Sequence, residues 1–260
     1  MILLSFDIEE FDMPLEYGVA IPFEDQMAVS IEGTERLLAV LEQQGVLATF
    51  YTTARFAESA PDLIKRMVAQ GHEIASHDYF HSEHHDHHLA ESKALLDRIS
   101  STTIKGFRMP RLQPVSNEAL VAAGYQYNSS MNPTWLPGRY NHFTKPRTLF
   151  KAGGLWQLPA SVTPWVRFPL FWISFHNLPL KLYQLLAQWT LKNDGYLNTY
   201  FHPWEFVTLE PKKYNFPSYV CKNTGAAMAD RLEKFIVWGK KKGYSFARTD
   251  HFIEQKTKSL

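Results

Sequence analysis

The sequence predicts an α/β protein whose mainly parallel sheet closes, or nearly closes, into a barrel. Amphipathic stretches that end at a glycine alternate with short apolar or β-rich runs, which is typical of strand–helix units. The strand candidates number about seven or eight, and this suits a closed barrel better than an open sheet. With 260 residues the chain has a common length for one α/β barrel. We therefore expect a single domain over residues 1–260.

The expected helices show apolar residues at the 3.6-residue spacing of a buried face. Leu37, Leu38 and Leu41 share one face of a helix expected over 33–45. The helices expected over 61–71, 116–124 and 229–243 also end at a glycine, which suits the left-handed position after a helix. Strand-like runs follow these four helices at 46–52, 72–77, 125–130 and 244–249. Further strand candidates are 2–6, 105–108, 155–158 and 197–201.

The segment 135–192 is less regular, because it is rich in proline and aromatic residues. Near its end, Leu182, Leu185, Leu186 and Trp189 share one face of an expected helix. One interpretation is a long crossover that covers the barrel. The other is an apolar lid or groove for a lipid-linked substrate.

Composition excludes several classes of protein. A formal net charge of +1, with no basic run interleaved with aromatics, argues against nucleic acid as a partner. One cysteine, Cys221, rules out an intrachain disulfide. No run of about 18 apolar residues exists, so no spanning helix is expected. The start, MILLSFDIEEFD, lacks the features of a secretory signal, so we expect a cytoplasmic location and leave contact with the inner membrane surface open.

Polar residues follow four strand candidates at the point where each strand ends. Asp7, His77, Arg108 and His202 follow ILLSF, HEIAS, IKGF and LNTYF. In α/β barrels the C-terminal ends of several strands supply the functional groups. These four side chains are therefore expected to form one site.

Carboxylates and histidines in this set are suited to a metal site. Asp7 and Glu9 would share one face of an extended chain, and one could bind a cation while the other accepts a proton. His77 and His81 are four residues apart and would face the same way on a helical turn. Two imidazoles and one carboxylate with open positions describe a catalytic metal site.

The stretch SHDYFHSEHHDHH holds six of the chain's eleven histidines. His84, His85, His87 and His88 have no clear acidic partners beyond Glu83 and Asp86. We expect these four to form a polar loop and the start of a helix, with no part in the metal site.

Four stretches together resemble the NodB-like polysaccharide deacetylases, also called carbohydrate esterase family 4. LLSFDIEE is similar to the family's first motif, usually TFDD, and ATFYTTARFAESAPDLIKRMVAQGHEIASHDYFH to its second region. GFRMPR is similar to the RxPY motif and LNTYFHPWEF to the last motif. LWQLPAS and HPWEF look closer to a bacterial subgroup associated with exopolysaccharide or cell-envelope gene sets.

The resemblance implies a distorted (β/α)7 barrel, a divalent metal ion that is usually zinc, and a role for each matching residue. Asp7 matches the catalytic base and Arg108 the arginine that orients it. His77 and His81 match the metal ligands. His202 matches the general acid.

The sequence departs from the family pattern at three places. The usual metal-binding acid follows the base directly, but this position is Ile8, so the resemblance and the strand geometry point to Glu9 rather than Glu10. The tyrosine of RxPY is Arg111, whose backbone N–H would still serve as an oxyanion donor. The acid that normally pairs with the general-acid histidine is not evident, and Glu205 is the substitute we predict.

The resulting hypothesis is metal-dependent removal of an N-acyl group, which we expect to be N-acetyl, from an amino sugar or polysaccharide. Arg111, Trp204 and Glu205 are the predicted substrate-binding residues, and Trp135 and Trp165 are further candidates for sugar stacking. One alternative is a deformylase or amide hydrolase acting on a lipid-linked sugar or a small ring amide. Another is a non-catalytic sugar-binding barrel, for which Ile8 is the best support.

Overall fold

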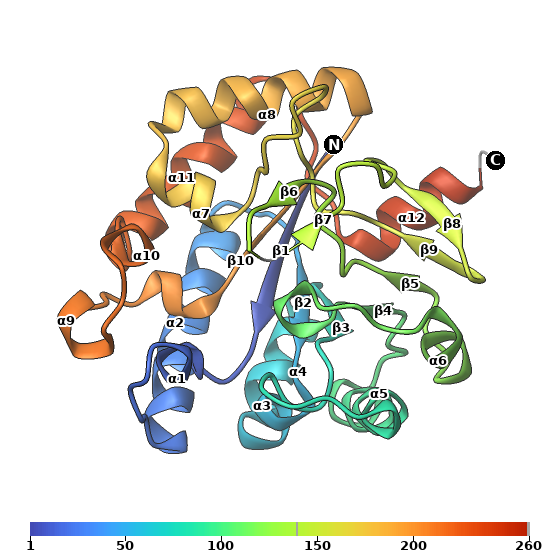
Figure 1. Cartoon of the computed structure of the whole chain (residues 1–260), viewed down its shortest axis with the longest axis vertical. Helices are drawn as coiled ribbons and strands as arrows, with labels where there is room; N and C mark the ends of the chain where they lie inside the picture. Colours follow the sequence, from blue (N-terminus) through green and yellow to red (C-terminus); the bar gives the residue numbers. More distant parts are fainter. Residues whose placement is uncertain (139, 259–260) are drawn as a thin grey trace.

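The computed structural model describes residues 1–138 and 140–258. At its centre is an eight-stranded sheet with the order β10-β1-β2-β3-β4-β5-β9-β8 (Figure 1). Every neighbouring pair is parallel except β8 and β9, which form an antiparallel hairpin. The strands of this sheet are β1 (Ile2–Ile8), β2 (Thr49–Thr52), β3 (Glu73–Ser76), β4 (Gly106–Phe107), β5 (Tyr127–Asn128), β8 (Phe150–Ala152), β9 (Leu155–Gln157) and β10 (Leu197–Phe201).

β10 and β9 lie at the two ends of the row of parallel strands and do not pair with each other. Hydrogen bonds instead join β10 to the segment that follows β9. The Ser161 backbone N–H donates to the Asn198 carbonyl at 2.8 Å, and the Asn198 N–H donates to the Ser161 hydroxyl, also at 2.8 Å. The Asn198 side-chain amide adds a bond to the Pro159 carbonyl at 3.0 Å. The predicted distorted (β/α)7 barrel is confirmed in this form: seven parallel strands curl around a common interior, with β8 added antiparallel at the edge.

Helices surround the sheet: Figure 1 shows α8 across the top of the view and α3, α4 and α5 at the bottom, and α11 packs against both α2 and α8. The α-helices are α1 (Met13–Glu16), α2 (Phe23–Gln43), α3 (Ala54–Ser59), α4 (Pro61–Ala69), α5 (Asp86–Ser100), α6 (Asn117–Ala122), α7 (Trp172–Asn177), α8 (Leu180–Asp194), α9 (Pro211–Tyr214), α10 (Ser218–Cys221), α11 (Ala226–Lys241) and α12 (Thr249–Thr257). Two 3₁₀ turns are η1 (Pro110–Leu112) and η2 (Pro203–Phe206), and a separate hairpin pairs β6 (Trp135–Leu136) with β7 (Tyr140–Asn141).

The predicted helix faces form the core. Leu37, Leu38 and Leu41 of α2 are buried with the apolar side chains of β1 and β2 in the main hydrophobic cluster. The helix ends also follow the sequence signals. The Thr53 hydroxyl caps α3 by accepting from the Phe56 N–H, and Gly71 after α4 has φ +89°, where a side chain would be strained.

Close packing of α2 on η2 fixes the turn that follows β10. A Cβ atom at Gly33 would lie 1.9 Å from the Pro203 carbonyl oxygen, so only glycine allows this approach. The Arg36 guanidinium donates to the Phe206 carbonyl at 3.0 Å on the same side. This contact matters for function, because η2 follows His202 and carries Glu205.

The predicted strand at 244–249 is wrong apart from one bridge. Phe246 pairs only with Ile2, and α12 already begins at Thr249. The reason is that β2 joins β1 only from Ser5 onward, so only the start of β1 has a free edge on that side. Ser245 and Ala247 bond to Ile2 there and the pairing stops.

The irregular segment 135–192 forms the two hairpins β6–β7 and β8–β9 and the helices α7 and α8. Tyr183, Ala187 and Leu191 of α8 pack into the main core, so the buried face differs from the one that the sequence indicated. Leu182 and Leu185 of the same helix are exposed, and Leu185 keeps 64% of its surface. Within the described ranges, no helix combines the length and the apolar character needed to cross a bilayer.

Candidate metal centre and catalytic pocket

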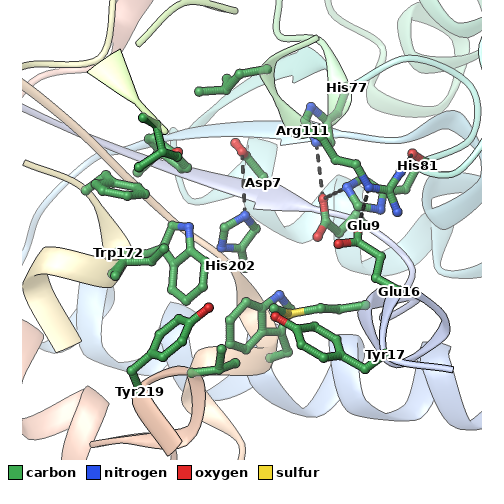
Figure 2. A pocket seen from close by; sticks show the side chains of 18 of the residues that line it. Asp7, Glu9, Glu16, Tyr17, His77, His81, Arg111, Trp172, His202 and Tyr219 are labelled. Atoms are coloured by element: carbon green, nitrogen blue, oxygen red, sulfur yellow. Dashed lines mark hydrogen bonds and ion pairs between the residues drawn. The ribbon is translucent and has the colours of Figure 1, made fainter. Parts of the chain in front are cut away.

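Side chains from the ends of β1, β3 and β10 meet in one pocket, as the sequence predicts (Figure 2). The pocket has a volume of about 390 Å³, within the range of small-molecule sites. Its floor and walls include the polar residues Asp7, Glu9, Glu16, His77, His81, Arg111 and His202 and the apolar or aromatic residues Leu136, Phe171, Trp172, Ile173, Tyr200 and Trp204. Acidic and basic groups therefore face one another across a partly apolar cavity.

Glu9, His77 and His81 form the candidate metal site. One ligand atom from each lies within 4.8 Å of the other two, and all three residues are buried. The Glu9 Oε2 atom is 3.2 Å from His77 Nε2 and 3.0 Å from His81 Nε2. Figure 2 shows both imidazoles directed at the Glu9 carboxylate.

The two histidines are oriented by hydrogen bonds through their other ring nitrogens. His77 Nδ1 donates to the Arg108 carbonyl at 2.8 Å, and His81 Nδ1 contacts Asp12 Oδ1 at 2.6 Å. These bonds fix each ring so that Nε2 faces Glu9, which is the usual arrangement behind metal-binding histidines. The donor set of two imidazole nitrogens and one carboxylate, with its outer hydrogen bonds in place, fits a divalent ion.

Electrostatics in this cluster favour a bound positive charge. Burial opposes ionisation of Glu9, but His81 and His77 hold the pKa of its carboxyl well below the usual range. Burial likewise disfavours charge on His81, yet Glu9 and Asp12 raise its pKa to about 10. A proton on His81 thus offsets part of the negative charge of Glu9 and Asp12, and a bound metal ion would replace that positive charge.

His77 and His81 do not lie on a helical turn, so that part of the prediction is wrong. Residues 77–85 form a loop, and Asp78 has φ +67°, which ends β3 sharply. The Asp78 carboxylate bonds to the Tyr79 N–H at 2.8 Å and to His84 Nδ1 at 2.5 Å. His84 therefore has a buried acidic partner that the sequence did not indicate, and it helps to hold the loop that brings the two ligands together.

Glu9 and Glu10 diverge as the alternation of an extended chain predicts. Glu10 turns away from the histidines, and the Thr53 hydroxyl donates to its carboxylate at 2.6 Å. Burial raises the pKa of Glu10, whereas the pKa of Glu9 is lowered. The structure thus places Glu9, and not Glu10, in the metal cluster.

Asp7 is held by a buried arginine, as expected. Arg108 Nη1 donates to Asp7 Oδ1 at 2.6 Å and to the Ser5 hydroxyl at 3.0 Å. The guanidinium lies 3.9 Å from the centre of the Tyr51 ring, so an aromatic face supports it from one side. Asp7 Oδ2 remains directed toward His202, whose Nε2 is 3.9 Å away.

His202 faces Asp7 across the pocket and is held from behind by Glu205. Glu205 Oε1 accepts from the His202 backbone N–H at 2.7 Å and from its Nδ1 at 2.9 Å. Burial lowers the pKa of His202, but Glu205, Glu9 and Asp7 raise it overall. The predicted partner of His202 is thus in contact with it.

Four of the predicted substrate contacts need correction. Glu205 has no exposed surface, so it positions His202 and does not line the pocket. Trp204 is 2% exposed and stacks on the His202 ring with centroids 5.2 Å apart, so packing is its main role. Trp135 and Trp165 are 62% and 82% exposed, but neither lines this pocket.

Arg111 lines the pocket, but its guanidinium is occupied. It forms ion pairs with Glu16 and with Asp12, the latter at 3.2 Å, and donates to the His81 carbonyl at 2.8 Å. The residue has φ +55° and therefore a strained backbone for a non-glycine residue. Its side chain braces the loop around His81, and only its backbone is left for the predicted oxyanion contact.

Two residues that the sequence reasoning missed support the site. Asp12 orients His81 and also pairs with Arg111. His176, from α7, contacts Glu205 Oε2 at 2.7 Å with both side chains fully buried. Asp12 could have been found from its place just after the Glu9–Glu10 pair. His176 has no sequence signal, because α7 comes from the irregular segment.

Residues 15–128 match the model of the family described as polysaccharide deacetylase. A chitooligosaccharide deacetylase from Bradyrhizobium sp. (strain ANU 289) is 35% identical over 85 residues, which are 30% of this chain and 39% of that protein. The chain spans between about a fifth and two fifths of the length of the curated relatives it matches. Asp7, Glu9 and His202 lie outside the matched segment, so their placement in the site comes from the structure.

Solved structures share the fold over nearly the whole chain. One from Mycobacterium smegmatis, assigned to the polysaccharide deacetylases, covers 100% of this chain and 91% of its own with 18% identity and a TM-score of 0.65. A pseudoenzyme of the CE4 family from Bacillus anthracis covers 96% of this chain and 64% of its own with 12% identity and a TM-score of 0.52. Because the second is a pseudoenzyme, the fold by itself does not establish activity, and the side chains in the pocket have to carry that argument.

Proposed function

The chain contains a polysaccharide deacetylase domain of the NodB type, and from this premise we propose that it is a metal-dependent hydrolase that removes an N-acyl group, chiefly acetyl, from an amino sugar. The observation that carries the proposal is one pocket in which an acid–base pair, Asp7 and His202, lies beside the cluster of Glu9, His77 and His81. Hydrolysis of an amide needs a group that accepts a proton from water and a group that gives one to the leaving amine.

Glu9, His77 and His81 are the residues that would hold a divalent ion, and the nitrogen-rich ligand set favours zinc among common metals. When bound, such an ion polarises an acyl carbonyl and lowers the pKa of water toward about 7. All three side chains are fixed by burial, and their geometry is set before the substrate enters.

Asp7 is the proposed general base. Its Oδ1 atom is engaged by Arg108 at 2.6 Å, which leaves Oδ2 on the pocket side to accept a proton from the attacking water. The buried guanidinium binds the carboxylate directly and limits its rotation. General bases of this kind typically contribute between about a hundredfold and ten-thousandfold to rate.

His202 is the proposed general acid. Glu205 fixes its Nδ1, so Nε2 is the atom that faces Asp7 and the substrate. The backbone N–H of Arg111 is the proposed donor to the oxyanion, and a donor of this kind is worth about 3 kcal/mol. Because the Arg111 side chain is tied to Asp12 and Glu16, the change from the family's tyrosine removes a side-chain contact but keeps the peptide group.

The test is a release assay with the zinc-loaded protein. Acetate and formate are measured after incubation with chitooligosaccharides, nucleotide-linked amino sugars and lipid-linked amino sugars. Acyl release that stops on chelation and returns with zinc supports the proposal. A protein that binds zinc in the pocket but releases neither acid from any of these compounds would instead be a sugar-binding barrel.

A lipid-linked amino sugar is a second candidate substrate, favoured by the surface of the irregular segment. Residues 119–193 contain seven Lys and Arg and no Asp or Glu. Trp135, Trp165 and Val166 are exposed within this segment. The Arg167 guanidinium donates to the Pro133 and Lys145 carbonyls, which joins the loops that carry the two tryptophans. Exposed tryptophans flanked by cations are typical of contact with an anionic lipid surface.

Co-sedimentation with vesicles tests this second candidate. The proposal expects binding to phosphatidylglycerol vesicles, little binding to phosphatidylcholine vesicles, and loss of binding in the double variant Trp135→Ser/Trp165→Ser. Equal and weak binding to both kinds of vesicle would argue against a lipid-linked substrate and favour a water-soluble sugar. The proposed reaction would be unaffected.

A further inference from the structure

A buried chain of three side chains runs from the pocket into α7. His202 Nδ1 contacts Glu205 Oε1 at 2.9 Å, and Glu205 Oε2 contacts His176 Nε2 at 2.7 Å. The opposite nitrogen of His176, Nδ1, lies 2.6 Å from the Lys222 carbonyl oxygen. We propose that His176 is a positioning residue that shares one proton with Glu205 and so sets the orientation and the proton affinity of His202. This inference rests on the proposed function, in which His202 is the general acid.

Hydrogen-bond chemistry restricts where protons can lie in this chain. A carbonyl oxygen only accepts, so His176 Nδ1 must carry a hydrogen to bond to Lys222. If Glu205 is a carboxylate, His176 Nε2 must carry a second hydrogen, and the ring is a cation. If His176 is neutral, Glu205 must be the protonated partner. In both cases one proton lies between Glu205 Oε2 and His176 Nε2, and the pair has no net charge.

The other oxygen of Glu205 is already fully used. Its Oε1 atom accepts from the backbone N–H of His202 at 2.7 Å as well as from the ring. Two donors at one oxygen hold the carboxyl plane, and the bond to His176 holds its other end. His202 is therefore clamped to present Nε2 to the pocket, where Asp7 Oδ2 lies 3.9 Å away.

The shared proton also controls the charge that His202 meets. Asp7 and Glu9 act on the ring from the pocket side and Glu205 from behind, and all three raise its pKa. The hydroxyl of Tyr183 in α8 also acts on Glu205, and burial raises its pKa well above the ordinary value. From α11, the Arg231 guanidinium donates to the Phe175 and Leu178 carbonyls beside His176. A lone buried carboxylate behind His202 would bind the imidazolium proton too tightly for efficient donation. Neutralisation by His176 reduces that attraction.

Trp172 connects the two histidines within the pocket wall. Its ring meets His176 edge-on with centroids 5.9 Å apart and His202 edge-on at 5.6 Å. Trp172 and His176 are four residues apart on α7, so one helix face provides both the wall and the buried histidine. This arrangement ties the irregular segment directly to the proposed general acid.

A purely structural role for His176 makes a different prediction. The residue also holds the loop after α10, since its own carbonyl accepts from the Asn223 amide at 2.7 Å. If this anchoring were its whole contribution, a substitution would lower thermal stability and leave the titration of His202 unchanged. The two roles can therefore be separated by pH.

The test compares His176→Gln with His72→Gln. Glutamine at 176 keeps a hydrogen-bond donor but cannot take up the proton. His72 is a matched control, because it is buried at the other end of the sheet, where its Nδ1 accepts from the Ala48 N–H. Histidine NMR of the metal-free protein is expected to show the His202 pKa raised by about one unit in H176Q, because the negative charge of Glu205 is no longer neutralised. The His202 pKa should be unchanged in H72Q.

In the zinc-loaded protein, H176Q should shift the alkaline limb of the pH profile of kcat/KM to higher pH by the same amount. It should also lower kcat several-fold with little change in KM. An unmoved limb and an unmoved His202 titration, with only a lower Tm, would overturn the proposal. If the wild type releases no acyl group, the proposed function fails, but the NMR titration still decides the inference. If H176Q does not fold, the wild-type spectrum decides it. A neutral His176 ring that carries its hydrogen on Nε2 rather than on Nδ1 contradicts the shared proton.

Discussion

Two buried glutamates at opposite ends of the sheet have pKa values shifted in opposite directions. Glu9 follows β1 at the pocket, and Glu73 begins β3 at the far end. Both are almost wholly buried, and burial alone would raise the pKa of each. The pKa of Glu9 is instead held well below its usual range, whereas that of Glu73 rises to about 7.

The neighbours explain the difference. Glu9 meets two imidazoles, whose Nε2 atoms are 3.2 and 3.0 Å away. Glu73 meets the neutral hydroxyls of Thr49 at 2.7 Å and Tyr127 at 2.8 Å, while Asp250 adds a negative charge. Arg248 also interacts with Glu73, but its direct ion pair is with Asp250, at 2.8 Å. One carboxyl is thus built to face positive charge, and the other to keep its proton.

The largest effect is expected at Asp7, beside the Glu9 end. Asp7→Asn removes the proton acceptor but leaves the three metal ligands in place, so turnover should fall roughly a thousandfold or more while bound zinc is retained. Kinetics and metal analysis of the same sample check this. Asp250→Asn at the Glu73 end is the control and should keep turnover within a few-fold of the wild type. Near-normal activity of D7N would remove Asp7 as the base.

A smaller loss is expected when the support of the general acid is weakened. Glu205→Gln keeps the size of the side chain, and its oxygen can still accept from His202 while its NH2 group donates to a neutral His176, but the amide cannot hold the proton that Glu205 and His176 share. We expect turnover to fall about tenfold to a hundredfold with unchanged zinc content. Equal activity of E205Q and wild type across pH 6–9 would show that His202 does not depend on this contact.

The Glu73 end should affect stability and not chemistry. A carboxyl whose pKa is raised on folding contributes stability that is complete below the unfolded value of about 4.5 and is lost as pH rises through the folded value of about 7. Glu73→Gln mimics the protonated form, so the free energy of unfolding should stop falling between about pH 5 and pH 7. At pH 8 the variant should be more stable than the wild type by about 3 kcal/mol.

Urea denaturation at several pH values measures this effect. Asp250→Asn, at the same end of the sheet, tests whether repulsion from Asp250 raises the pKa of Glu73. If it does, this variant should also reduce the pH dependence of the free energy of unfolding. A wild-type curve without any decline between pH 5 and pH 7 would mean that Glu73 is ionised in the folded protein, and the comparison with Glu9 would fail.

Much of the site could be predicted from the sequence, because strand ends are marked by local signals. The apolar runs before Asp7, His77 and His202 place each residue at the C-terminal edge of a parallel sheet, where distant segments converge. The choice of Glu9 over Glu10 follows from the alternation of an extended chain. The prediction of one domain over 1–260 stays a prediction.

What could not be predicted depends on contacts between segments far apart in the chain. The convergence of His77 and His81 needs the left-handed Asp78 and its bond to His84, and no helical period encodes this loop. The burial of Trp204 against His202 and the contact of His176 with Glu205 depend on how α7 packs on η2. Spacing along the chain does not reveal such packing.

The most direct test is zinc affinity measured by calorimetry on metal-free wild type, Glu9→Gln and Glu73→Gln. The same change of carboxylate to amide is made at both ends, so the chemistry of the substitution is matched. We predict that zinc affinity falls more than a hundredfold in E9Q and stays within twofold of wild type in E73Q, in line with the loss of one direct ligand. Wild-type affinity in E9Q would contradict the assignment of Glu9, His77 and His81 as the metal centre.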